Sequence, residues 1–217
     1  MKENFPPEAF RRQDESPDES FYGQPRFVTH IDDRAIAAVT QLYREYFPPG
    51  GSVLDLMSSW VSHLPEEVEY GRVVGLGMNE AELSRNPRLS DYAVRNLNRD
   101  PTLPFGDDEF DGCGICVSID YLTRPVGVLR EVSRVLKPGA PLVVTFSNRC
   151  FPTKAVAVWH TLDDAGHVRL VSDYLAAAGF TGVESLDRSP RRMFSDPLYA
   201  VVGRSARPSE KPEERGL

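Results

Sequence analysis

Residues 50–60 place the strongest constraint on how this chain can fold. Two glycines follow two prolines and open a short apolar run, residues 53–56, which contains Asp55. Small polar residues come directly afterwards. This order is typical of a buried parallel strand that leads into a helix N-terminus in an open α/β sheet. Doubly wound folds bind nucleotides in the crevice at such a strand end, so the segment predicts a nucleotide-type cofactor.

The length and charge of the chain limit the classes of protein to consider. A chain of 217 residues is long enough for one well-packed domain and short for two. The formal net charge of −7 argues against a large nucleic-acid footprint, which needs clustered Lys and Arg. The sequence has no apolar stretch long enough to cross a bilayer and no signal-peptide pattern, so we expect a cytoplasmic protein without a membrane partner.

Two of the three cysteines, Cys113 and Cys116, have a spacing that can indicate zinc binding or redox chemistry. They lie in an apolar segment that we interpret as a strand. Residues three apart on a strand point to opposite faces, and no second Cys/His pair at ligand spacing accompanies them. We therefore expect core cysteines and no metal site.

Helical and strand patterns alternate along most of the chain. Residues 1–20 are rich in Pro, Glu and Asp and are expected to form a flexible N-terminal arm, and residues 205–217 a flexible tail. Residues 21–204 are expected to form a single domain. Within it, the patterns predict helices over residues 32–47, 60–64, 79–83, 125–137, 153–160 and 164–178, and strands over residues 52–56, 72–77, 92–97, 110–118, 141–147, 181–186 and 198–202.

Five sequence segments occur together in a characteristic order, at residues 53–56, 72–75, 103–111, 120–125 and 129–139. Among them are Val-Leu-Asp-Leu, Leu-Pro-Phe-Gly-Asp and Val-Leu-Lys-Pro-Gly. This succession resembles the class I S-adenosylmethionine-dependent methyltransferases, in particular the kind called methyltransferase type 11. The resemblance implies a Rossmann-like methyltransferase fold: a doubly wound, mostly parallel seven-stranded sheet with an antiparallel C-terminal hairpin.

The same resemblance implies S-adenosylmethionine as cofactor and indicates which residues would bind it. The chain departs from the family at several of these positions. Met57, Ser59 and Val61 stand where the loop after the first strand usually has glycines. Gly77 stands where an acidic residue usually binds the ribose, a role that Asn79 or Glu80 could take over, and the family's carboxylate near the adenine amino group falls near Asn96. The expected cofactor-binding residues are Tyr22, Asp55, Met57, Ser58, Ser59, Gly77, Asn79, Asn96, Leu97 and Ser118.

The resemblance places the methyl group opposite the end of the fourth strand. Asp120 and Tyr121 are therefore the first candidates to orient a methyl acceptor or take its proton. An equally plausible interpretation is that Asp120 caps a turn and Tyr121 packs in the core. His30 is a further catalytic candidate, because it belongs to a segment with aromatic and cationic residues that precedes the first helix. His63, just beyond the first loop, is the next.

These observations lead to one principal hypothesis and one alternative. We expect an enzyme that transfers a methyl group from S-adenosylmethionine to a small or medium-sized molecule. The alternative is a degenerate methyltransferase fold that acts as a non-catalytic binding or interaction module, which the altered loop and Gly77 favour. A nicotinamide dehydrogenase would need a G-x-G-x-x-G sequence after the first strand, and the chain has none there. The sequence identifies neither the acceptor nor the oligomeric state.

Overall fold

The structure is a computed structural model, and it describes residues 5–191 and 194–206. Its strands are β1 (Ser52–Leu56), β2 (Arg72–Gly77), β3 (Asp91–Val94), β4 (Gly112–Cys116), β5 (Pro141–Phe146), β6 (Thr181–Asp187) and β7 (Tyr199–Arg204). Its α-helices are α1 (Asp18–Tyr22), α2 (Asp33–Tyr46), α3 (Glu80–Leu83), α4 (Pro125–Val135), α5 (Ala157–His160) and α6 (Asp164–Ala177). Short 3₁₀ helices lie at Pro7–Phe10 and Ile119–Tyr121.

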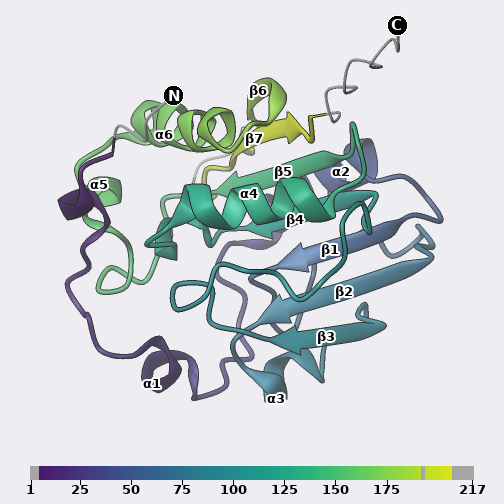
Figure 1. Ribbon diagram of the computed structural model, residues 1–217, viewed down its shortest axis with the longest axis horizontal. Helices are drawn as coiled ribbons and strands as arrows, with labels where there is room; N and C mark the ends of the chain where they lie inside the picture. Colours follow the sequence, from purple (N-terminus) through teal and green to yellow (C-terminus); the bar gives the residue numbers. More distant parts are fainter. Residues whose placement is uncertain (1–4, 192–193, 207–217) are drawn as a thin grey trace, which may run out of the picture.

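The strands form one sheet with the order β3-β2-β1-β4-β5-β7-β6 (Figure 1). The pairs from β3 to β5 are parallel, and β7 runs antiparallel to both β5 and β6. The predicted doubly wound sheet with an antiparallel C-terminal hairpin is thus confirmed. Strand order reverses between β1 and β4, which is where open α/β sheets leave a crevice at the carboxyl ends of their strands.

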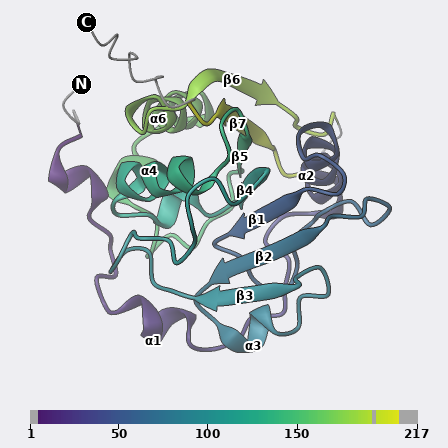
Figure 2. The same ribbon diagram turned by 45° about the vertical axis from the view of Figure 1, so that its right-hand side comes forward.

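The central strands are apolar because both of their faces are covered. Successive residues contribute to different hydrophobic clusters: Leu54 packs with α4 and α6, whereas Val53 packs with α2. Figures 1 and 2 show α4 and α6 on one side of the sheet and α2 on the other. Cys113 belongs to the first cluster and Cys116 packs against the second. Both are free thiols on opposite faces, as the strand spacing predicted.

Helix α2 begins and ends where the sequence indicates. The Asp32 side chain caps it by accepting hydrogen bonds from the backbone N–H groups of Arg34 and Ala35. Its buried stripe faces β4 and β5. The chain leaves the helix at Phe47, just before the two prolines.

The connection from β1 to β2 differs from expectation. A short helix was predicted over residues 60–64, but residues 57–71, all of which the structure describes, contain no helix. His63 has a φ of 51°, which interrupts helical geometry, and Pro65 disfavours helical backbone at the residue before it. The Ser62 side chain is bonded to Asp55 instead of pointing to solvent. Consequently no helix N-terminus faces the crevice from this connection.

Residues 5–20 pack on the domain in the structure, and residues 5–30 are together called the arm. Asp18 is buried and accepts hydrogen bonds from Arg12 and Asn98. The ammonium group of Lys154, which has no exposed surface, lies 3.5 Å from the Asp18 carboxylate. At the other end of the chain, Ser205 is buried against α4. Most of the expected tail, residues 207–217, lies outside the described residues.

Several other element boundaries differ by a few residues, and β3, β4 and α5 are examples. The strand expected over residues 92–97 is β3, which ends at Val94, and the strand expected over residues 110–118 is β4, which ends at Cys116. Only Ala157–His160 of the helix expected over residues 153–160 is helical. None of these shifts changes the order of the elements.

Candidate functional site

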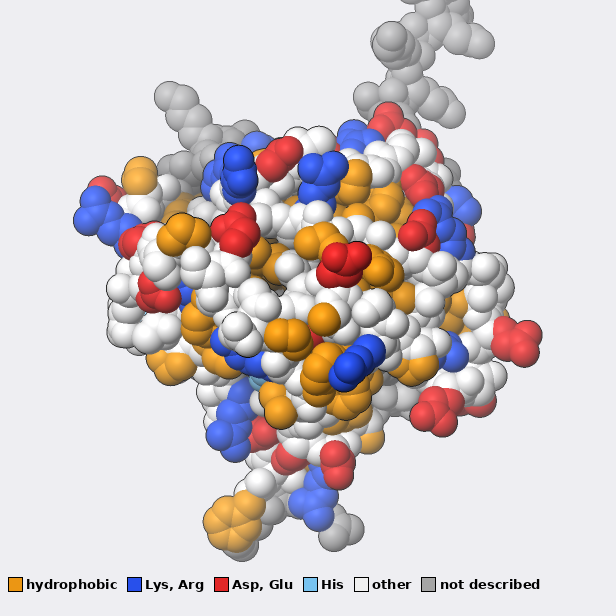
Figure 3. Space-filling model, turned by 90° about the horizontal axis from the view of Figure 1, so that it is seen from below, with side chains coloured by type: hydrophobic (Ala, Val, Ile, Leu, Met, Phe, Trp, Pro, Cys, Tyr) orange, Lys and Arg blue, Asp and Glu red, His pale blue; other side chains and the backbone are white. Residues whose placement is uncertain are grey.

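A pocket opens at the carboxyl ends of β1, β2 and β4, at the point where the strand order reverses. It encloses about 1220 Å³, including its open mouth. The arm contributes Asp18 and several residues between Tyr22 and His30 to its wall. The loop after β1 contributes the adjoining part, where Trp60 Nε1 donates to the Val28 carbonyl oxygen. Figure 3 shows the side of the molecule that carries α1 and α3, where hydrophobic side chains lie among charged groups of both signs. On that side, Lys and Arg do not merge into one basic patch.

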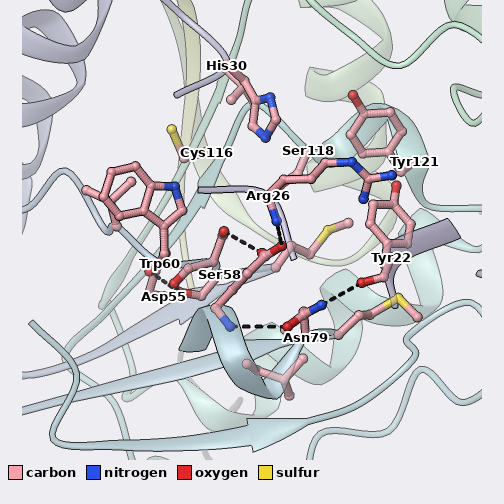
Figure 4. A pocket seen from close by; sticks show the side chains of 18 of the residues that line it. Tyr22, Arg26, His30, Asp55, Ser58, Trp60, Asn79, Cys116, Ser118 and Tyr121 are labelled. Atoms are coloured by element: carbon pink, nitrogen blue, oxygen red, sulfur yellow. Dashed lines mark hydrogen bonds between the residues drawn. The ribbon is translucent and has the colours of Figure 1, made fainter. Parts of the chain in front are cut away.

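The end of β1 supplies the floor of the pocket. Asp55 is buried, and its Oδ2 accepts hydrogen bonds from the hydroxyl groups of Ser58 at 2.5 Å and Ser62 at 2.7 Å (Figure 4). Burial raises the pKa of Asp55 to about 6, although the two serine bonds act in the opposite direction. Met57, at the first family glycine position, has a φ of 60°. This left-handed backbone is uncommon for a residue with a side chain, so the loop keeps the glycine conformation without the glycine.

Gly77 lies at the end of β2, directly beside the loop after β1. A Cβ atom on residue 77 would stand closer than 3.0 Å to the carbonyl oxygen of Ser58. Any side chain there would require the two backbones to separate. The missing acidic residue of the family is therefore excluded by the packing of this loop.

The two asparagines that were expected to replace family carboxylates are engaged elsewhere. Asn79 caps α3 through its Oδ1 and donates its Nδ2 hydrogens to the carbonyl oxygens of Tyr22 and Gly23. Asn96 Oδ1 accepts from the backbone N–H groups of residues 98 and 99, and its Nδ2 donates to Glu19. A carbonyl oxygen has two lone pairs, so Asn96 has no acceptor left for an adenine amino group. Both side chains hold the arm and the strand ends together.

The end of β4 combines an unpaired hydroxyl with an aromatic ring. Ser118 Oγ is buried, lines the pocket and has no hydrogen-bond partner among the described residues. Tyr121 also lines the pocket, and its hydroxyl oxygen accepts a hydrogen bond from the backbone N–H of Phe151 at 2.8 Å. Burial raises the pKa of Tyr121 well above its usual range, so this hydroxyl stays protonated. Asp120 is buried, does not line the pocket, and has a pKa raised by burial to about 8.

The arm carries the cationic and imidazole groups of the pocket. The Arg26 guanidinium lies 4.6 Å from the ring centre of Phe21 and 5.4 Å from that of Phe151. Figure 4 shows it extending toward Tyr121, with His30 beside it. The His30 ring meets Phe151 edge-on at 5.1 Å, and burial lowers the pKa of His30 below its usual value.

His63 enters the same pocket from the loop after β1. Burial lowers its pKa to about 4, and the nearby His30 acts in the same direction. Both imidazoles are therefore neutral at pH 7.

The structure thus gathers most of the residues predicted from the sequence around one pocket. Tyr22, His30, Tyr121 and every expected cofactor residue line it, whereas Asp120 does not. Sequence reasoning did not select Glu82 or Phe151, which also line it. Glu82 was interpreted only as part of a helix start, and nothing local in the sequence relates Phe151 to the arm. Among the described residues, no group of three or more His, Cys, Asp or Glu side chains is placed to bind a metal, and no helix is long and apolar enough to cross a membrane.

Comparison with known proteins identifies the domain. Residues 58–144 match the model of a family described as a methyltransferase domain. A demethylmenaquinone methyltransferase from Lactococcus lactis is 36% identical over 107 residues, which are 43% of this chain and 41% of that protein. The chain carries a class I S-adenosylmethionine-dependent methyltransferase domain. It spans less than half the length of this curated relative.

Solved structures agree on the fold. A methyltransferase from Archaeoglobus fulgidus superposes with a TM-score of 0.58 at 14% identity, covering 79% of this chain and 94% of the other. The [4+2]-cyclase SpnF superposes with a TM-score of 0.61 at 17% identity, covering 87% and 91%. At these identities the likeness concerns the fold alone. The activity must be argued from the site, because one fold carries different chemistries.

S-adenosylmethionine is the cofactor of this class of domain, and the residues of the pocket fit its chemical parts. Arg26 offers a cation for the carboxylate of the methionine part. Met78, Leu97 and Leu122 provide apolar surface for a base. The unpaired, buried hydroxyl of Ser118 is a hydrogen-bond donor that a ligand in the pocket would satisfy. The fit does not depend on the family's usual glycines.

Proposed function

We propose that this protein transfers the methyl group of S-adenosylmethionine to a small or medium-sized acceptor molecule. The observation that carries the proposal is the position of the pocket, at the carboxyl ends of β1, β2 and β4 of a class I sheet. The arm covers this pocket with aromatic rings and a guanidinium. A cover of this kind limits access of water and aligns two bound molecules, which is where much of the acceleration of a group transfer originates.

The bound cofactor supplies an electrophilic methyl group. The residues of the chain orient the acceptor molecule and accept its proton. Ser118 and Tyr121, at the end of β4, offer hydroxyl groups to a polar group of the acceptor. His30 is a better base than Asp120, since a neutral imidazole lines the pocket whereas the Asp120 carboxyl is buried outside it.

The acceptor remains to be assigned within this proposal. Relatives named demethylmenaquinone methyltransferases make demethylmenaquinone the first compound to assay. The rim of the pocket has apolar surface for the carbon skeleton of such an acceptor: Val28 is 56% exposed, and Trp60 packs edge-on against Phe27.

A non-catalytic binding module is the competing function. It is favoured by the engaged amide groups of Asn79 and Asn96, which leave fewer free groups for a cofactor. The unpaired Ser118 hydroxyl favours a pocket that still binds a ligand over a module that acts only through its surface.

Calorimetric titration with S-adenosylmethionine and S-adenosylhomocysteine tests the proposal. The variant Arg26→Met tests whether the guanidinium binds the carboxylate of these ligands. We expect both ligands to bind, and the variant to bind them at least 10-fold more weakly, because it loses a charge-assisted hydrogen bond. The affinity for 5′-methylthioadenosine, which has no carboxylate, should be equal in the two proteins. Arg85→Met is the matched control, since Arg85 lies over the Phe27 ring and does not line the pocket. Absence of binding by wild type at millimolar ligand would favour the non-catalytic module.

A further inference from the structure

The pocket contains carboxylate groups from three residues, and their surroundings differ. Asp18 is held in the ion-pair network with Arg12 and Lys154. Asp55 is buried in the floor, bonded to serines of its own loop. Glu82, the third residue of the four-residue α3, is half-buried and faces the pocket between the arm and the loop after β1.

Glu82 lies beside the strand end that lacks the family's acidic residue. Its Oε2 accepts the hydroxyl hydrogen of Ser59 at 2.6 Å, and its Oε1 accepts the backbone N–H of Arg26 at 2.7 Å. Ser58, the neighbour of Ser59, is the residue whose carbonyl oxygen blocks a side chain on Gly77. Two successive loop residues therefore close the strand-end position and hold the Glu82 carboxylate next to it.

The carboxylate retains hydrogen-bonding capacity in this arrangement. An ionised carboxylate has about four acceptor positions, and the bonds from Arg26 and Ser59 use one on each oxygen. The two free positions suit a pair of neighbouring hydroxyl groups. Of the two candidates for this role from the sequence, Asn79 is bonded to α3 and to the arm, and Glu80 is exposed and does not line the pocket.

We propose that Glu82 binds the ribose hydroxyl groups of the cofactor, in place of the acidic residue that Gly77 excludes, and thereby links ribose binding to the arm. This inference rests on the proposed function. Because Glu82 Oε1 also holds the backbone of Arg26, a ligand that orients this carboxylate stabilises the arm residue offering a cation to the same ligand. Recognition of the ribose and positioning of Arg26 are then linked through one carboxylate.

A comparison of ligands with and without ribose hydroxyl groups tests the assignment. S-adenosylhomocysteine and its 2′,3′-dideoxy analogue are titrated by calorimetry into wild type and into Glu82→Gln. We expect the deoxy analogue to bind wild type at least 10-fold more weakly, and this penalty to fall to within 3-fold in the variant. Glutamine keeps one acceptor for the Arg26 N–H, so the arm contact does not depend on the charge.

Two further variants separate ribose binding from local structure. Glu80→Gln makes the same chemical change on the same helix at an exposed residue that does not line the pocket, so the full deoxy penalty should remain. Glu82→Asp draws the carboxylate back by one methylene and should give an intermediate penalty even if Glu82→Gln folds poorly. An undiminished penalty in both Glu82 variants would overturn the assignment and leave the proposed function standing. If wild type binds neither ligand, the proposed function fails, and this inference fails with it.

Discussion

The Lys154 ammonium lies 2.8 Å from the carbonyl oxygen of Ser16, so a side chain with no exposed surface holds the N-terminal arm. The same ammonium lies 3.1 Å from a carboxylate oxygen of Asp14 and 3.5 Å from one of Asp18. A buried ammonium persists only where such partners replace its hydration. The segment before α5 and the arm are therefore interdependent, although they are far apart in the sequence.

Replacing this ammonium should release the arm. In Lys154→Met the aliphatic stem is kept, while Asp18 loses one of its two cationic partners in a buried site. Removing one partner of a buried pair costs roughly 3–5 kcal/mol of unfolding free energy. Urea denaturation should show this loss, and hydrogen exchange should show faster exchange in α1. Lys137→Met is the control, because that lysine pairs with Asp111 at a half-exposed site and such pairs contribute about 0–1 kcal/mol. Equal stability of both variants would contradict the role of Lys154 in holding the arm.

The structure reverses the effect that the sequence predicts for Gly77→Asp. From the family pattern, a restored carboxylate would tighten cofactor binding. The Cβ atom would instead collide with the Ser58 carbonyl, a backbone atom that cannot turn aside. We expect a loss of about 1–3 kcal/mol in stability, the usual cost of overpacking, together with weaker binding of S-adenosylhomocysteine.

Gly127→Ala is the matched control for that substitution. Gly127 lies inside α4, and its nearest neighbour to a new Cβ atom, in Pro101, is 3.9 Å away. Alanine should fit there and add about 0.5–1 kcal/mol. A Gly77→Asp protein as stable as wild type, with tighter binding, would show that the loop after β1 moves freely.

The pH dependence of stability should report the burial of Asp120. Its pKa rises from 3.8 to about 8 in the folded protein, mainly through burial. Between these values the folded state holds a proton that the unfolded state has released, so stability falls as the pH rises through this window. Asp120→Asn removes this effect. Its stability advantage over wild type should therefore grow from pH 4 to pH 8, as measured by urea midpoints.

Asp32→Asn is the control with the opposite sign. Bonds from backbone N–H groups, first that of Ala35, lower the pKa of Asp32. Its contribution is therefore present above pH 3.8 and is lost as the pH falls. The titratable neighbours of Asp120 do not add to its pH dependence. Burial raises the pKa of Tyr22, Tyr121 and Cys150, so these groups stay neutral between pH 4 and pH 8. An Asp120→Asn advantage that is constant with pH would indicate an Asp120 that is ionised in the folded state.

The fold could be predicted because its signals are local. Each buried strand appears as an apolar run with its own turn, and the spacing of Cys113 and Cys116 was sufficient to assign them to opposite faces. The ends of α2 followed from Asp32 and the two prolines. Patterns of this kind are set by burial and by caps within a few residues, so they can be recognised without tertiary information.

The site could be predicted only in outline, because its details depend on contacts between distant segments. Asn79 and Asn96 are polar residues in the expected places, but the sequence does not show that the arm engages both. The expected helix over residues 60–64 is absent because Ser62 bonds to Asp55 and His63 adopts a left-handed backbone. Likewise, no local pattern pairs Lys154 with Asp18.

The last prediction concerns the base. Once an acceptor is found, His30→Gln should slow single-turnover methyl transfer by about 10²–10⁴-fold, the usual contribution of a positioned base. Affinity for S-adenosylhomocysteine should stay the same, since the change affects the acceptor's proton. Burial lowers the pKa of His30 below its usual value, so the wild-type rate should fall on acidification at a lower pH than for an exposed imidazole base. His160→Gln is the control, because His160 is bonded to the Pro152 carbonyl and does not line the pocket.

Tyr121→Phe would be ambiguous here, because it leaves the Phe151 N–H without a partner and can act through stability. A His30→Gln rate within twofold of wild type would exclude His30 and direct the search to His63, the other neutral imidazole facing the pocket.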